Sequence, residues 1–245
     1  RKRTLFPYTT LFRSGGFLPF DEHIRPARPQ FFRLSHHGSF ANPEMSELQE
    51  DVINKSVPEC GLYIVMPDAK TPEDVDRLAF QLRQALLAAN KFSTYYMNRH
   101  VVEYRPFEGE DDKIATALLY KNVAQHGGFI FLIYDDVLLA REVEADGVLC
   151  SSIKHASEAR TLLSEDKIVG LHCSTQTAAQ SALALELDFV SFFAAKGGDG
   201  SLNLLNWWTS MSENPAAIEG QFDQENCEAF VRAGATFIQA DHHIW

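Results

Sequence analysis

Two short segments of this chain carry residue types that can do chemistry. His172 follows the apolar segment 168–171, and a histidine can exchange a proton near neutral pH. The alternative is a structural, hydrogen-bonded histidine. Lys196 precedes Gly197 and Gly198, and glycines leave backbone N–H groups free to bind an anion, although a plain flexible loop fits the same residues. The sequence thus offers one acid–base group and one anion-binding loop.

The segment Asp241, His242 and His243 suggests a transition-metal site at first sight. Neighbouring residues of a strand point to opposite faces, so only Asp241 and His243 can share a ligand. A third ligand at a recognisable spacing is missing from the sequence, and we predict no metal here.

Composition limits the class of partner. The chain has 245 residues, of which 45% are apolar, and a formal net charge of −11. Nucleic acids and anionic membranes prefer basic surfaces, so we expect neither as a partner. The apolar runs are shorter than the ~20 residues of a membrane span, and the four cysteines show no paired spacing. We predict a soluble cytoplasmic protein with reduced thiols, and leave open a homo-oligomer.

The first 60 residues look different from the rest. Residues 1–14 are basic, and the string Phe6–Ser14 resembles a translated sequencing adapter, so we exclude them from the fold. Residues 15–60 contain five prolines without a sustained period and predict an irregular arm. The folded domain is expected at 61–245.

From Gly61 onwards, apolar strands alternate with amphipathic helices. The first helix is predicted to begin after Thr71 as N-cap, with Pro72 in the first turn and Asn90 as its stop. The eight predicted strands are Gly61–Met66, Phe92–Met97, Phe129–Ile133, Gly147–Cys150, Ile168–Leu171, Phe189–Phe193, Ala216–Ile218 and Thr236–Ala240.

Such regular alternation requires parallel strands, because each helix returns the chain to the same edge. Eight strands can close into an α/β (β/α)₈ TIM barrel; a doubly wound open sheet is the alternative. The chain stops at Trp245, just after the eighth strand, so we predict a barrel whose last helix is lost by truncation.

Several segments, in order along the chain, resemble the thiamine phosphate synthase/TenI family. The segment Ile133–Ser152 is similar to the family's third strand, short helix and fourth strand, including a Gly-Ala-Asp-Gly-Val run. The other similar segments are Ile168–Thr175, Glu186–Phe193, Leu202–Trp208, Ala216–Asn226 and Arg232–Ala240.

The resemblance implies an enzyme of thiamine biosynthesis that acts on small phosphorylated precursors. Such enzymes join a hydroxymethylpyrimidine diphosphate to a thiazole phosphate and release pyrophosphate. The reaction must stabilise a departing diphosphate and a pyrimidine-methyl cation, for which carboxylate-held Mg²⁺ and basic side chains are suited. A TenI-like thiazole phosphate isomerase and a catalytically degenerate ligand-binding barrel are the alternatives.

By resemblance, Asp135 at the end of strand three matches a metal carboxylate, although Asp135 or Asp136 can instead cap the next helix. The second metal position is Lys154, which cannot bind Mg²⁺ and is expected to pair with Asp135 or with a phosphate. Arg99 is the remaining cation of a basic triplet expected after strand two, with a role at pyrophosphate or as a solvated loop residue.

The resemblance also assigns the later strand ends. His172 stands where TenI-type enzymes use a histidine, and Lys196 takes over a phosphate-binding role. The phosphate-binding glycine pair and serine after strands seven and eight fall on Glu219, Gly220 and Asp241. Two carboxylates beside a phosphate repel it, which argues against ordinary activity.

Overall fold

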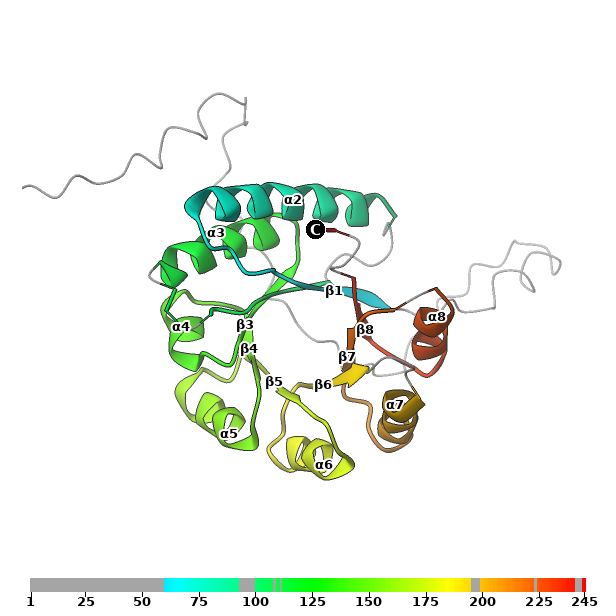
Figure 1. Ribbon diagram of the computed structural model, residues 1–245. Helices are drawn as coiled ribbons and strands as arrows, with labels where there is room; N and C mark the ends of the chain where they lie inside the picture. Colours follow the sequence, from blue (N-terminus) through cyan, green and yellow to red (C-terminus); the bar gives the residue numbers. More distant parts are fainter. Residues whose placement is uncertain are drawn as a thin grey trace, which may run out of the picture. The chain divides into compact units, whose positions relative to one another are not determined.

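The computed structural model describes residues 60–92, 100–107, 109–110, 112–194, 199–222, 224–240 and 244–245. Predictions for residues 1–59, including the adapter-like segment and the irregular arm, lie outside this range. The described residues form a closed barrel of eight parallel strands in chain order, as predicted (Figure 1). The strands are β1 (Gly61–Val65), β2 (Val101–Tyr104), β3 (Ile130–Tyr134), β4 (Gly147–Cys150), β5 (Ile168–His172), β6 (Phe189–Ala194), β7 (Ala216–Gly220) and β8 (Phe237–Gln239).

Helices between the strands cover the outside of the barrel (Figure 1). They are α2 (Pro72–Phe92), α3 (Lys113–His126), α4 (Val137–Glu142), α5 (Ile153–Leu162), α6 (Gln176–Ala184), α7 (Asp199–Met211) and α8 (Gln224–Arg232). The predicted start of α2 is confirmed, since Thr71 Oγ1 accepts a hydrogen bond from the Asp74 N–H at 3.1 Å. Asp136, and not Asp135, caps α4 by accepting from the Leu139 N–H at 2.9 Å.

The predicted position of the second strand is wrong. The α2 helix runs through Asn90 to Phe92, and β2 begins only at Val101. All four residues of β2 are buried and pair in register with β3, and the first three also pair with β1. Burial on both faces and this pairing set the position of the strand. The residue that follows strand two is therefore Arg105, and Arg99 precedes that strand.

The inside of the barrel is packed with side chains over most of its length. Its apolar layer includes Leu132, Leu149 and Phe189. Gly170 in β5 makes room for the Phe189 ring, since a Cβ at this glycine would lie 2.2 Å from a ring carbon. Above this layer, towards the carboxyl ends of the strands, the inward-facing residues become polar. The apolar layer therefore fills the lower part of the barrel, and the polar side chains lie at its carboxyl end.

The segment after β8 is described only at its last two residues. Ile244 and Trp245 pack against the outer core, and the Trp245 indole N–H donates to the Val65 carbonyl at 3.2 Å. The predicted loss of a final helix by truncation stays a prediction.

Candidate active site

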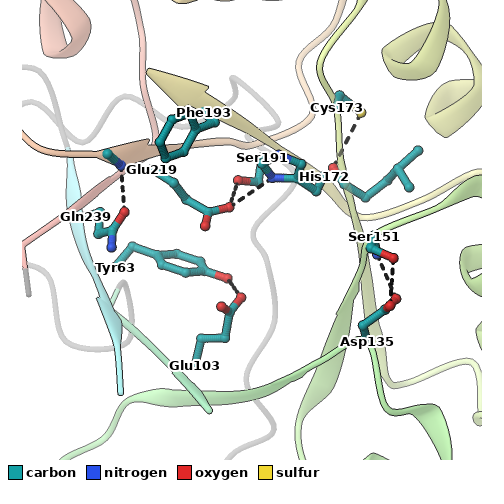
Figure 2. A network of polar contacts seen from close by, with 12 residues as sticks. Tyr63, Glu103, Asp135, Ser151, His172, Cys173, Ser191, Phe193, Glu219 and Gln239 are labelled. Carbon is teal, nitrogen blue, oxygen red and sulfur yellow. Dashed lines mark hydrogen bonds and ion pairs between the residues drawn. The ribbon is translucent and has the colours of Figure 1, made fainter. Parts of the chain in front are cut away.

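Polar side chains from three strands meet inside the carboxyl end of the barrel (Figure 2). Glu103 and the following Arg105 come from β2, Ser191 from β6 and Glu219 from β7. In each strand, alternate residues face the barrel interior, so Glu103 and Arg105 lie on the same face two residues apart. This polar cluster is the candidate active site.

Glu219 is the centre of the cluster. Its carboxylate is buried and accepts hydrogen bonds from the Arg105 guanidinium and the Ser191 hydroxyl. The His172 Nδ1 lies 3.3 Å from Glu219 Oε1. Burial alone would raise the pKa of Glu219, but His172, Arg105 and Ser191 outweigh burial and lower it to about 2. Glu219 is therefore an anion that orients an arginine and a histidine.

Glu103 is the second carboxylate and behaves differently. It is completely buried, accepts from the Tyr63 hydroxyl and contacts the same Arg105 guanidinium. Burial raises the pKa of Glu103 to about 7, although the charge of Arg105 opposes the shift. One guanidinium thus serves two carboxylates, and only Glu219 is firmly ionised around neutral pH.

Three side chains connect this cluster to the barrel mouth. The Arg105 side chain is 35% exposed and lies over the Tyr134 ring at 4.5 Å from its centroid. His172 is 28% exposed, and Phe193 presents an aromatic ring that is 59% exposed. The mouth therefore offers two nitrogen donors, Arg105 and His172, and two aromatic rings, Tyr134 and Phe193, above the ionised Glu219.

Asp135 belongs to a separate set of contacts at the ends of β3 and β4. Its backbone has a φ of 54°, which is unusual for a residue other than glycine. The carboxylate accepts from the Ser151 N–H at 2.8 Å and the Ser151 hydroxyl at 2.6 Å, and His155 Nδ1 lies 2.8 Å away. Burial would raise the pKa of Asp135, but the hydrogen bonds from Ser151 and His155 outweigh it and lower the pKa.

These residues do not fit a Mg²⁺ site. Magnesium is usually held by one or two carboxylates together with waters and substrate phosphates, whereas both oxygens of Asp135 are already engaged by Ser151 and His155. Within the described residues, no cluster of three metal-binding side chains exists. The predicted Lys154–Asp135 pair is also absent from this part of the chain. Lys154 is 82% exposed and lies 3.9 Å from Glu158 instead.

The remaining predicted residues divide into two groups. His172 and Gly220 lie at the mouth, but the Gly220 N–H already donates to Gln239 Oε1 at 2.6 Å. Residues 99, 196–198 and 241 lie outside the described residues, so the roles predicted for Arg99, Lys196, Gly197, Gly198 and Asp241 stay predictions.

Glu103 and Arg105 are central to the site but are not among the residues predicted from the sequence. The misplaced second strand hid them, because it put these residues in a loop. The signal that could have found them is the alternation in the segment 101–105, where two charged residues share one face behind two valines.

Comparison with known proteins identifies the family of this chain. The family model described as thiamine monophosphate synthase matches residues 62–243. The chain belongs to this family. The thiamine-phosphate synthase of Chromobacterium violaceum is 30% identical over 188 residues, which cover 73% of this chain and 84% of that protein. The corresponding protein of Erythrobacter litoralis is 30% identical over 126 residues, but this match spans only 59% of its length and 47% of this chain.

Solved structures show the same fold. Thiamine phosphate pyrophosphorylase from Pyrococcus furiosus superimposes with a TM-score of 0.57 over 75% of this chain and 86% of that chain, at 18% identity. The predicted family and the TIM barrel are thereby confirmed, and the isomerase and binding-barrel alternatives gain no comparable support. The described residues contain no helix long and apolar enough to cross a membrane.

Proposed function

We propose that this chain is a transferase of the thiamine-phosphate synthase type. It would join the methylene carbon of a hydroxymethylpyrimidine diphosphate to the ring nitrogen of a thiazole and release pyrophosphate. The observation that carries the proposal is Glu219 joining Arg105 and His172 at the mouth of a barrel that belongs to this family.

Arg105 and His172 are the groups suited to the departing diphosphate. Both side chains are partly exposed at the mouth, and both are held in place by the same buried carboxylate. Because Glu219 fixes their positions before substrate binds, little reorganisation is needed when negative charge develops on the leaving oxygen. A proton donated by His172 would further stabilise that oxygen.

The ionised Glu219 is suited to the pyrimidine part of the reaction. Breaking the bond between carbon and diphosphate leaves positive charge on the pyrimidine methylene group. The ionised Glu219 below the mouth favours such a cation, and the exposed ring of Phe193 can flank it. We assign no step to a metal ion, since Asp135 and its neighbours do not fit one.

The test is a coupling assay on the whole chain. Hydroxymethylpyrimidine diphosphate is incubated with thiazole phosphate or thiazole alcohol, and the product is oxidised to fluorescent thiochrome. We expect product above a no-enzyme control and a loss of roughly a hundredfold or more in His172→Ala. His126→Ala, at an exposed position at the end of α3, is the matched control and should be unchanged.

A negative result has a clear meaning when the protein is folded. Circular dichroism checks folding, and an active member of the family run in parallel checks the assay. If no thiochrome forms with either thiazole, the transferase proposal is wrong. Phosphorylated precursors as ligands, a cytoplasmic location and a homo-oligomer remain proposals alongside it.

A further inference from the structure

Glu103 is buried within the polar cluster, and the proposed function gives it no contact with substrate. Its carboxyl is completely shielded from solvent. The Tyr63 hydroxyl donates to Glu103 Oε2, as Figure 2 shows, and the Arg105 Nε–H donates to Glu103 Oε1. A buried carboxyl is hard to ionise unless a partner supplies a full positive charge. The charge state of Glu103 therefore depends on Arg105.

The charge of Arg105 is divided between two carboxylates. Its Nε–H donates to Glu103, and an Nη2–H donates to Glu219. Glu219 also contacts Ser191 and His172, and these partners together hold its pKa at about 2. Burial raises the pKa of Glu103 to about 7. Glu103 is therefore the carboxylate of this pair that can hold a proton near neutral pH.

The titratable groups that face Glu103 come from four strands. They are Tyr63 of β1, Arg105 directly after β2, Tyr134 of β3 and Glu219 of β7. Burial raises the pKa of both tyrosines, so both stay neutral near pH 7. The arginine stays charged, and Glu219 stays ionised. Among these groups of the described residues, Glu103 is the one whose charge changes near neutral pH.

Arg105 connects this buried carboxyl to the mouth of the barrel. A guanidinium has five N–H donors, and the two carboxylates use one on Nε and one on Nη2, which leaves three for other groups. The Arg105 side chain is 35% exposed, and a guanidinium is suited to two parallel bonds with phosphate oxygens. When Glu103 is ionised, one positive charge stands against two negative charges, and a diphosphate is repelled. When Glu103 holds a proton, the charges of Arg105 and Glu219 balance.

We propose that Glu103 is a positioning residue that sets, through Arg105, how tightly the mouth binds a diphosphate, and that it takes up a proton from solvent when the diphosphate binds. This inference rests on the proposed function for the role of Arg105 at the diphosphate. The protonated carboxyl still accepts from the Arg105 Nε–H through Oε1, and its O–H faces the Tyr63 oxygen, which can accept it. The guanidinium thus keeps its position. Proton uptake and diphosphate binding must strengthen each other, because coupling between two sites is reciprocal.

The test is calorimetric titration of the whole chain with inorganic pyrophosphate at pH 6, 7 and 8. Glu103 is about nine-tenths ionised at pH 8 and about one-tenth ionised at pH 6, so wild-type binding should weaken about tenfold more over this range than binding by Glu103→Gln. Changes in the charge of pyrophosphate itself and of other side chains are common to both proteins and cancel. Glu165→Gln, at an exposed position, is the matched control and should follow the wild type.

Proton uptake gives a second readout that a merely structural role would not change. Titrations at pH 8 in two buffers of different ionisation enthalpy count the protons bound with each pyrophosphate. The wild type should take up close to one proton more than Glu103→Gln. If that variant fails to fold, Tyr63→Phe decides the matter. The Tyr63 hydrogen bond lowers the pKa of Glu103, so its loss should move the weakening of pyrophosphate binding to higher pH.

Equal weakening in the wild type and in Glu103→Gln would overturn the inference, as would an unchanged pH dependence in Tyr63→Phe. A wild type that does not bind pyrophosphate at pH 6 would also overturn it. The thiochrome assay separates this inference from the proposed function. Turnover together with equal pH dependence in the two proteins sinks the role of Glu103 and leaves the transferase. The expected difference in pyrophosphate binding without any turnover supports Glu103 as the regulator of diphosphate binding and sinks the transferase.

Discussion

Replacing Glu103 with glutamine should change how the stability of this protein depends on pH. Glu103 is completely buried, and its pKa rises from an ordinary value of 4.5 to about 7 in the folded state. Between these values the folded state binds a proton that the unfolded state has released. The free energy of unfolding of the wild type therefore falls as pH rises through this window.

The size of the effect follows from the shift. Each unit of difference in pKa is worth about 1.4 kcal/mol, so the wild type should lose on the order of 3 kcal/mol between about pH 4.5 and 7 through this group. Glutamine resembles the protonated carboxyl in shape and cannot ionise. The Glu103→Gln variant should therefore lack this loss, and its stability relative to the wild type should increase as the pH rises through this window. Glu219, whose pKa is lowered to about 2, acts in the opposite sense, because its contribution is present above pH 4.5 and lost as the pH falls.

Urea unfolding followed by tryptophan fluorescence measures the effect, since Trp208 is buried. The quantity of interest is the difference in unfolding free energy between wild type and Glu103→Gln at pH 5, 6, 7 and 8, in which the other titrating groups cancel. Glu165→Gln, at an exposed position, is the matched control and should give a flat difference. A flat difference for Glu103→Gln as well would refute the reasoning, because Glu103 would then ionise at its ordinary pKa.

Three further perturbations test other parts of the structure. Arg105→Met leaves Glu103 and Glu219 without their shared cation and should lower the free energy of unfolding in urea by about 3–5 kcal/mol at pH 8. The loss should be smaller at pH 5, because Glu103 then holds a proton. Asp135→Asn should lower the free energy of unfolding by about 1–3 kcal/mol, because it weakens the contacts at the ends of β3 and β4. Calorimetric titration with Mg²⁺ should give the same weak signal for the variant and the wild type. Tight Mg²⁺ binding that is lost in the variant would contradict our view of this site. Gly220→Ala should destabilise the protein by more than about 2 kcal/mol in the same unfolding assay, because its Cβ meets the Ala194 carbonyl. Gly200→Ala, whose Cβ meets nothing within 4 Å, is the control and should be neutral or stabilising. Similar effects of the two substitutions would count against the tight packing of β7 on β6.

The site differs from ordinary expectations for its family in a specific way. At Asp135 the structure has a hydrogen-bonded carboxylate that does not fit Mg²⁺, and at Gly220 it has a backbone N–H that already has a partner. In both places a side chain of this protein already contacts the group that a ligand would need: His155 contacts the Asp135 carboxylate, and Gln239 accepts from the Gly220 N–H. Chemistry at the mouth then depends mainly on Glu219 and the two donors that it orients.

The sequence by itself determined the fold and the family. Near-continuous apolar strands alternating with amphipathic helices leave few alternatives to a parallel barrel, and a barrel places strand ends such as His172 on one rim. These inferences depend on period and order along the chain, which local residues encode.

The tertiary structure decided which side chains meet. Glu103 and Glu219 are 116 residues apart, counting between their positions in the chain. Both contact Arg105 because closure of the barrel through β1 and β8 brings β2 and β7 to the same end of one interior. The position of β2 itself depended on its burial and on its pairing with β1 and β3. These long-range contacts also decide which backbone N–H groups have a hydrogen-bond partner and which carboxylate is ionised. Both properties depend on burial and on the groups that lie nearby.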